Sequence, residues 1–309
     1  MAENIREQLN EKDGFQVWWR LLRPHTLTAS FVPVFVGTML AVIYEGSFHL
    51  PLFLAMLIAS ILIQAATNMF NEYYDYKRGL DNEKSVGIGG TIVRDGISPQ
   101  TVKNLAFVFL AIAALLGVYI CLTSSLWIAV IGLISMAVGY FYTGGPYPIA
   151  YTPLGELFSG FFMGPVIIGI SFFIQTDDVT WAVFFVSIPI GLFIASIMTS
   201  NNIRDRVNDA ENGRKTIAIL LGHQASIVFL ASMFALAFII TIILIIVGML
   251  PYWSFITLLA IPKTIQVIKG FIGKTEPLEM MPAMAATGKT NTIFGLLLSI
   301  SLLIHSFFI

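Results

Sequence analysis

Long apolar runs separated by short polar connections make up most of the chain. A helix that crosses a ~30 Å hydrocarbon core needs about 20 apolar residues. The pattern therefore predicts an all-α, polytopic membrane bundle of nine transmembrane helices. The predicted spans cover residues 25–44, 50–70, 102–121, 125–142, 155–174, 180–200, 225–248, 252–272 and 290–308.

The predicted span at 252–272 is interrupted by Pro262 and Lys263. Proline removes a backbone donor, and a lysine inside hydrocarbon is costly. If this segment does not cross, eight spans remain and the two termini lie on the same side of the membrane. With nine spans the termini lie on opposite sides.

Basic residues indicate the orientation, because short cytoplasmic loops retain Lys and Arg. All of the 17 basic residues except Lys263 fall before the first span, or in or beside the connections that follow spans two, six and eight. The N-terminus is therefore predicted to be cytoplasmic and the C-terminus to lie outside. Residues 1–22 are polar and lack the apolar core of a signal peptide, so they are predicted to form a cytoplasmic segment.

Composition agrees with this class of protein. The chain is 57% hydrophobic and 11% charged, with a mean hydropathy of +0.83, whereas soluble domains are roughly 25% charged. We expect one domain over residues 1–309, in the cell membrane and surrounded by lipid. A net charge of -1 indicates no nucleic-acid partner, and the single cysteine, Cys121, excludes a disulfide framework within one chain.

Two polar stretches stand at the ends of apolar segments, in the long connections 71–101 and 201–224. Asn71 and Asp75 are four residues apart, and Asn201, Asp205 and Asp209 repeat that spacing. Residues four apart share one face of a helix. Each stretch therefore presents a row of oxygen ligands, and the predicted orientation places both rows on the cytoplasmic side.

Asp81 lies six residues after Asp75, and Gly79 between them can break the helix and let Asp81 return to the same point. Carboxylates at helical spacing repel one another unless a cation lies between them. Oxygen ligands without His or Cys favour Mg²⁺, which is typically held by a few carboxylates together with substrate phosphates. The pattern predicts a phosphorylated substrate.

Basic residues beside both stretches suit phosphate contact. They are Lys77, Arg78, Lys84 and Arg94 after the first stretch, and Arg204, Arg206, Arg214 and Lys215 around the second. The uncharged connection 143–154 is rich in turn formers and is expected to fold back against the bundle.

Two other interpretations stay open at this point. In the first, the stretches are mixed-charge cytoplasmic loops whose acids are neutralised by neighbouring bases and bind no ligand. Acids near spans can also line an ion path, as in a cation transporter. A transporter, however, would place ionisable groups in the middle of its spans, whereas these acids lie at helix ends.

The residues resemble the intramembrane aromatic prenyltransferases of the UbiA superfamily, whose motifs are N-D-x-x-D with a further Asp, and D-x-x-x-D. The chain has Asn71-Glu72-Tyr-Tyr-Asp75 with Asp81, and Asp205-Arg-Val-Asn-Asp209. It is most similar to the branch that prenylates 1,4-dihydroxy-2-naphthoate for menaquinone synthesis. That similarity lies in Arg23-Pro-His-Thr26, the gap from Asp75 to Asp81, and the segments 89–97, 142–156 and 201–209.

Two features depart from the general family pattern. Glu72 stands where many members have Asp, so we leave it out of the expected metal ligands. No Lys or Arg occurs from 104 to 203, whereas hydroxybenzoate-type members carry a Lys near the end of span four. This absence argues against 4-hydroxybenzoate as the acceptor, which remains the alternative.

The resemblance implies Mg²⁺-dependent transfer of a polyprenyl group from polyprenyl diphosphate to 1,4-dihydroxy-2-naphthoate, with loss of carbon dioxide and diphosphate. The expected metal ligands are Asn71, Asp75, Asp81, Asn201, Asp205 and Asp209, with Asp75, Asp205 and Asp209 as the catalytic acids. The expected diphosphate contacts are Lys84, Arg94, Arg204 and Lys215. For the aromatic substrate we expect Arg23, Tyr142 and Tyr147, although an anchoring or packing role fits these residues equally well.

Overall fold

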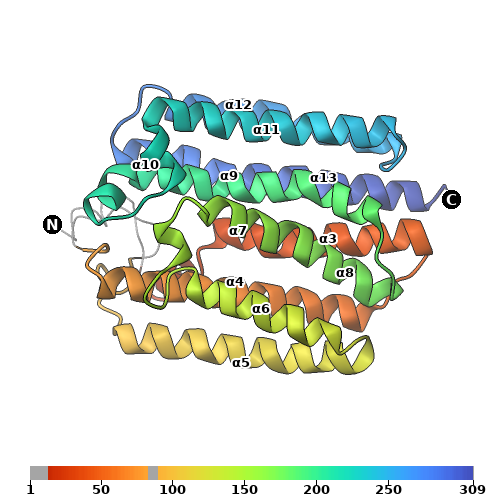
Figure 1. Cartoon of the computed structure of the whole chain (residues 1–309), viewed down its shortest axis with the longest axis horizontal. Coiled ribbons are helices and arrows are strands. Elements are labelled where there is room, and N and C mark those ends of the chain that lie inside the picture. The colour runs from red at the N-terminus through yellow and green to blue at the C-terminus, as the bar shows by residue number, and fades with distance from the viewer. Residues whose placement is uncertain (1–12, 83–89, 309) are drawn as a thin grey trace.

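Long helices lie side by side, and their connections collect at the two ends of the bundle (Figure 1). The computed structural model describes residues 13–82 and 90–308, and every regular element in these ranges is helical. The elements are α2 (Phe15–Leu22), α3 (Pro24–Glu45), α4 (Leu50–Lys77), α5 (Pro99–Thr123), α6 (Trp127–Phe141), η1 (Ile149–Tyr151), α7 (Gly155–Phe161), η2 (Phe162–Val166), α8 (Ile167–Thr176), α9 (Trp181–Glu211), α10 (Ile217–Leu221), α11 (His223–Ile246), η3 (Tyr252–Ala260), α12 (Ile261–Phe271) and α13 (Pro277–Ser306).

Eight helical segments of the described chain are long and apolar enough to cross a membrane. They include Tyr252–Phe271, the segment with Pro262 and Lys263, where the proline stands in the first turn of α12. The predicted span at 125–142 corresponds to α6, which is apolar but only 15 residues long. An all-helical multi-pass protein is therefore confirmed, and the ninth crossing stays a prediction.

The last predicted span, 290–308, falls on α13, which begins earlier, at Pro277, and includes Lys289. Within the predicted span, Asn291 is satisfied by the neighbouring helix, since its Nδ2 donates to Thr28 Oγ1 of α3 at 2.9 Å. This internal partner offsets the cost of burying the amide.

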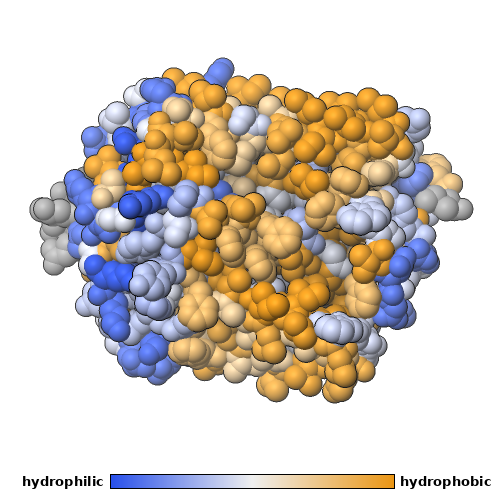
Figure 2. Space-filling model, viewed as in Figure 1, coloured by the Kyte–Doolittle hydropathy of each residue, from blue (hydrophilic) through white to orange (hydrophobic). Residues whose placement is uncertain are grey.

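On the face seen in Figure 2, an apolar belt covers the middle of the bundle, between more hydrophilic ends. Exposed large side chains such as Leu115, Leu122 and Leu133 contribute to it. A surface of this kind is stable in contact with lipid rather than with water. The belt therefore agrees with the predicted membrane environment.

Close backbone contact sets how α7 and the following η2 pack on α9. A Cβ atom on Gly164 would lie 2.6 Å from the Gly191 Cα, and one on Gly160 would lie 2.8 Å from the Gly191 carbonyl oxygen. Only glycine allows such an approach. One helical turn before Gly160, the same contact holds Glu156 beside Asn202 of α9.

Candidate active site

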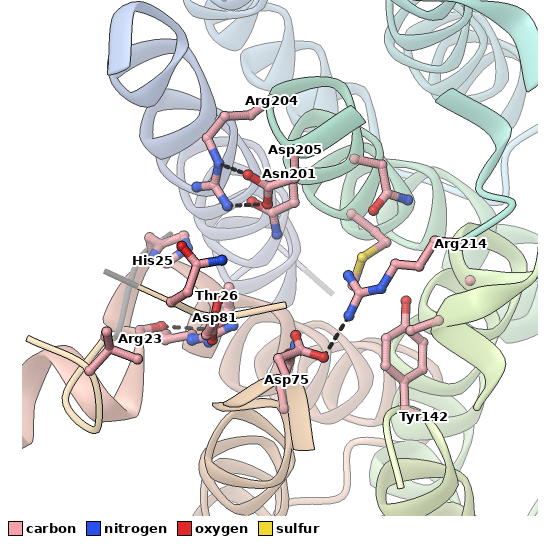
Figure 3. Close-up of a pocket in the computed structure, with 18 of the residues that line it drawn as sticks. Arg23, His25, Thr26, Asp75, Asp81, Tyr142, Asn201, Arg204, Asp205 and Arg214 are labelled. Carbon is pink, nitrogen blue, oxygen red and sulfur yellow. Dashed lines mark hydrogen bonds and ion pairs between the residues drawn. The ribbon is translucent and has the colours of Figure 1, made fainter. Parts of the chain in front are cut away.

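A polar cavity of about 90 Å³ lies among the last turns of α4, the start of α3, the segment after residue 90 and the end of α9 (Figure 3). We call it the polar cavity. Nine of the residues predicted from the sequence line it, namely Arg23, Asn71, Asp75, Asp81, Arg94, Tyr142, Asn201, Arg204 and Asp205. The two acidic stretches thus face one space.

The end of α4 brings Asp81 back to Asp75 as predicted. The helix ends at Lys77, and Gly79 has a φ of +79°, a conformation that glycine adopts without strain. The backbone N–H groups of Leu80 and Asp81 both donate to the Asp75 carbonyl oxygen, at 2.9 and 3.3 Å. This turn closes the chain on itself and places the Asp81 side chain in the polar cavity.

The acids lie close enough to affect one another. Burial and then the charge of Asp75 raise the pKa of Asp81 from 3.8 to about 7, with smaller contributions from Glu72 and Asp205, while Arg23 opposes the shift. A carboxyl group in such surroundings is stabilised as an anion by an added cation. Asn201 Oδ1 and Asp209 Oδ2 are also buried, without a hydrogen-bond partner in the described chain.

Arg214 joins the two stretches. Its Nη2 donates to Asp75 Oδ1 at 2.6 Å (Figure 3), and its Nη1 donates to Asp209 Oδ1 at 3.1 Å. Burial alone would lower the pKa of Arg214, but the two carboxylates outweigh it and raise the pKa. The sequence pattern places Arg214 among the bases beside the second stretch but does not distinguish it as a site residue. The turn at Gly213, with a φ of +79°, decides which of two adjacent bases faces inward.

Arg204 pairs with its neighbour Asp205, through Nε at 2.7 Å and Nη2 at 2.5 Å. Asp209 lies just outside the polar cavity and lines an adjoining outer cavity of about 840 Å³, together with Asp75, Asp81 and Asp205. Within residues 13–82 and 90–308, no three acidic, His or Cys side chains form a preassembled metal site. The donor set nevertheless fits Mg²⁺, which keeps several waters and shares its ligands with substrate phosphates.

An apolar cavity of about 480 Å³ extends from the polar cavity between α3, α4, α5, α6, the α7–α8 segment and α9. Its wall includes lipid-exposed residues such as Leu122, Leu126 and Leu133. Six residues line both cavities: Arg23, Thr26, Asn71, Tyr142, Met198 and Asn201. These six residues, the junction residues below, mark where a charged space meets an apolar one.

The backbone of Arg23 has a left-handed conformation, with a φ of 52° between α2 and α3. Such a conformation is unfavourable for a residue with a side chain and is often found at functional sites. Arg23 Nη2 lies 3.9 Å from Glu72 Oε2, which is a weak ion pair. The guanidinium group therefore remains available to a ligand at the junction.

Glu72 faces away from the polar cavity. It is 1% exposed, and its Oε1 accepts hydrogen bonds from Thr91 Oγ1 at 2.5 Å and from the Ile92 N–H at 3.1 Å. These bonds hold the segment that carries Arg94 against α4. Its placement agrees with leaving Glu72 out of the expected metal ligands.

Two predicted residues are described but line none of the cavities, and a third lies outside the described residues. Lys215 and Tyr147 are exposed, and neither lines the polar, outer or apolar cavity. Lys84 lies outside the described residues. Asn202, which the sequence analysis did not single out, lines the polar cavity. Its position next to Asn201 at the end of an apolar segment was the available signal.

The 143–154 loop folds back over this end of the bundle, as expected. Arg78 donates to the Thr143 and Gly145 carbonyl oxygens, and the Lys215 N–H donates to the Tyr151 carbonyl oxygen at 3.0 Å. The Arg78 and Arg214 guanidinium groups lie 5.4 and 5.1 Å from the centre of the Tyr151 ring. The loop thereby ties the first acidic stretch to the second.

Curated relatives match almost the whole chain. It is 56% identical to the 1,4-dihydroxy-2-naphthoate octaprenyltransferase of Bacillus subtilis (strain 168), over 94% of each chain. It is 28% identical to the enzyme of the same name from Mycobacterium tuberculosis (strain ATCC 25618 / H37Rv), over 92% of this chain and 95% of the relative.

Solved structures share the fold. A UbiA homolog from Aeropyrum pernix K1 superposes with a TM-score of 0.68 at 16% identity, covering 91% of this chain and 98% of that chain. A UbiA homolog from Archaeoglobus fulgidus bound to GPP and Mg²⁺ gives 0.61 at 17% identity, covering 92% and 99%. Residues 30–277 match the UbiA prenyltransferase family. The chain is a multi-pass membrane transferase that belongs to the UbiA prenyltransferase family.

Proposed function

We propose that the protein transfers a polyprenyl group from polyprenyl diphosphate to 1,4-dihydroxy-2-naphthoate, with loss of carbon dioxide and diphosphate. The observation that carries the proposal is the junction, where a cavity lined by acids and bases meets an apolar cavity. A prenyl diphosphate has the same division into a charged head and an apolar tail. The name of the Bacillus subtilis relative supports the choice of acceptor.

The acidic and amide side chains of the two stretches would hold Mg²⁺, directly or through water. The proposed ligands are Asn71, Asp75, Asp81, Asn201, Asp205 and Asp209. When bound, Mg²⁺ would neutralise the negative charge that develops on the leaving diphosphate. The raised pKa of Asp81 and the unpartnered oxygens of Asn201 and Asp209 favour a cation here.

Arginine side chains complete the diphosphate site. Arg94 and Arg204 line the polar cavity, and so does Arg214, which we add to the proposed contacts. Their guanidinium groups suit bidentate contact with phosphate oxygens. Lys215 is exposed here, so it would contact the diphosphate only after substrate binding moves it inward. Lys84, which we also propose as a diphosphate contact, lies outside the described residues.

The aromatic acid would bind at the junction with its carboxylate on Arg23. Tyr142 lines both cavities, so its ring lies where the allylic cation would form. The apolar cavity excludes water, which would otherwise quench that cation. The ring carbon that bears the carboxylate forms the new bond to the prenyl group, and the electron pair of the broken carboxylate bond returns to the ring as carbon dioxide leaves.

We also propose that the site faces the cytoplasm of a cell-membrane protein, as the basic residues around it indicate. The acidic stretches and the start of α3 lie at the same end of the bundle (Figure 1).

The test uses the purified full chain with Mg²⁺, polyprenyl diphosphate and either 1,4-dihydroxy-2-naphthoate or 4-hydroxybenzoate. Product mass and released carbon dioxide are measured. We expect decarboxylative transfer to the naphthoate, lowered by roughly 10²–10³ in Asp75→Asn and Asp205→Asn. Asp178→Asn, an exposed change at the far end of α8, is the matched control. Transfer to 4-hydroxybenzoate alone, or full activity in both site variants, would overturn the proposal.

A further inference from the structure

The segment 142–156 closes on itself beside the polar cavity. The Ala150 N–H donates to the Tyr142 carbonyl oxygen at 2.9 Å. A Cβ atom on Gly155 would lie 2.9 Å from the Tyr142 hydroxyl oxygen, so this hydroxyl occupies the space that a side chain would need. Figure 3 shows the Tyr142 ring beside Arg214, with the hydroxyl group at the cavity end of the ring. Glycine at 155 thus keeps a polar group of Tyr142 next to Glu156.

Glu156 is a buried carboxyl group that the proposed metal and diphosphate sites do not use. It is 3% exposed at the start of α7. Its Oε1 accepts one hydrogen bond, from Asn202 Nδ2 at 2.9 Å, and its Oε2 has no partner in the described chain. Burying a carboxyl group with so few partners is costly. Glu156 follows Gly155, which lines the polar cavity. A buried carboxyl group in this position suggests a function in the neighbouring site.

The contact with Glu156 fixes the orientation of the Asn202 amide. In the structure the amide nitrogen of Asn202 donates to Glu156 Oε1, the orientation that a carboxylate, which accepts hydrogen bonds and donates none, selects. Asn202 and Tyr142 both line the polar cavity. The polar atoms left for a ligand on this wall are therefore an acceptor, Asn202 Oδ1, and a hydroxyl group, Tyr142 Oη.

The charges around this wall select what binds there. The carboxylate of Glu156 repels a second carboxylate, and Arg214 beside Tyr142 is already paired with Asp75 and Asp209. A ring hydroxyl, by contrast, can donate to Asn202 Oδ1. Arg23, on the α2–α3 side of the same cavity, is the group that suits the carboxylate of the acceptor. The two walls thus distinguish the two kinds of polar group on a hydroxylated aromatic acid.

We infer that Asn202, held in place by Glu156, accepts a hydrogen bond from a ring hydroxyl of the aromatic acceptor. This inference rests on the proposed aromatic acceptor. Glu156 is a positioning residue, and Asn202 is a specificity-determining residue. The contact transfers no proton. It increases the electron density of the ring and orients the ring with its carboxylate toward Arg23.

The test compares Asn202→Ala, Glu156→Gln and wild type in steady-state kinetics. For Asn202→Ala we expect the KM for 1,4-dihydroxy-2-naphthoate to rise about tenfold or more, with the KM for polyprenyl diphosphate unchanged. In Glu156→Gln the new amide can donate as well as accept, so it also permits the rotated orientation of the Asn202 amide. We expect a smaller rise in the KM for 1,4-dihydroxy-2-naphthoate in this variant. Thr199→Val removes a buried hydroxyl from the same helix, where it bonds the Ala195 carbonyl oxygen, and serves as control.

Substrate analogues give the decisive comparison. Wild type and Asn202→Ala are assayed with 1-hydroxy-2-naphthoate and 4-hydroxy-2-naphthoate. If the inference holds, the variant loses catalytic efficiency with the analogue that keeps the contacted hydroxyl and matches wild type with the other. Equal losses with both analogues, or equal rises in both KM values, would show a merely structural role and overturn it.

Failure of the proposed function gives a different result. If wild type prenylates another hydroxylated aromatic acid instead, the same variants are compared on that acid and its deoxy analogue. Loss of discrimination there supports the Asn202 contact even though the naphthoate assignment has failed. Unchanged discrimination contradicts the contact whichever acceptor is used.

Discussion

Arg214 Nη2 lies 2.6 Å from Asp75 Oδ1, and this ion pair joins two residues that are 139 positions apart in the sequence. The same guanidinium group reaches Asp209. It therefore supplies positive charge between the two rows of acids. In the proposed reaction Mg²⁺ and Arg214 are two cations that serve the same set of carboxylates.

Removing this guanidinium group should make stability depend on the metal. We expect Arg214→Gln to lower the free energy of unfolding by about 3 kcal/mol without Mg²⁺, because it leaves buried carboxylates unpaired. Mg²⁺ should restore more stability to the variant than to wild type. Thermal unfolding in detergent with and without Mg²⁺ measures both effects. The control is Lys274→Gln, whose ion pair with Glu279 is exposed; an equal loss in that variant would contradict the prediction.

The pKa of Asp81 sets a pH dependence for metal binding. In the folded protein the pKa of Asp81 is raised to about 7. Neutral Asp81 therefore contributes to the free energy of unfolding of the metal-free protein at low pH, and this contribution is lost as pH rises through 7. Above that pH the carboxylate is ionised and available to Mg²⁺. The apparent dissociation constant for Mg²⁺ should therefore rise about tenfold per unit as pH falls below 7, the limit for one proton.

Titration of Mg²⁺-dependent activity between pH 6 and 8.5 measures this constant. Asp81→Asn should bind Mg²⁺ more weakly and lose the part of the pH dependence that Asp81 causes. A variant with the wild-type profile would show that another group is responsible.

Gly79 should matter for metal binding beyond its effect on stability. Alanine at a φ of +79° is strained by about 1 kcal/mol, and relief of that strain moves Asp81 away from Asp75. We expect Gly79→Ala to raise the Mg²⁺ concentration for half-maximal activity several-fold. Gly248 follows the C-terminal end of α11 and has the same φ as Gly79. Gly248→Ala should therefore lower the free energy of unfolding by a similar amount and leave the Mg²⁺ requirement unchanged. Equal Mg²⁺ requirements in the two variants would refute the prediction.

A bulky side chain in the apolar cavity should select against long donors. Gly132 of α6 lines this cavity, and a Cβ atom there would meet no atom within 4 Å. Gly132→Phe should reduce catalytic efficiency with long polyprenyl diphosphates by roughly tenfold and affect a short, two-isoprene donor much less. Gly169→Phe, which is equally open but outside the cavity lining, is the control. Equal losses with long and short donors would place the tail elsewhere.

Local spacing predicted much of the site. The four-residue steps placed Asn71 with Asp75 and Asn201 with Asp205 on one cavity, and Gly79 identified the turn that returns Asp81. The sequence could not choose between Arg214 and Lys215, because a single glycine turn decides which of the two side chains faces inward. From the sequence, Asn202 had no assigned role and Glu156 was given no catalytic role. Their contact depends on the packing of α7 against α9, which spacing along one chain does not reveal.

The junction residues lie between two cavities, and this position separates the routes by which the two products leave. Diphosphate is highly charged, and the outer cavity beside Asp209 leads it toward water. The prenylated ring is almost wholly apolar, and the cavity wall near Leu122 and Leu133 borders lipid. In the proposed reaction the two products therefore separate into two immiscible solvents as they leave. Dilution of each product in its own phase opposes the reverse reaction, so the membrane itself helps to make the transfer one-directional.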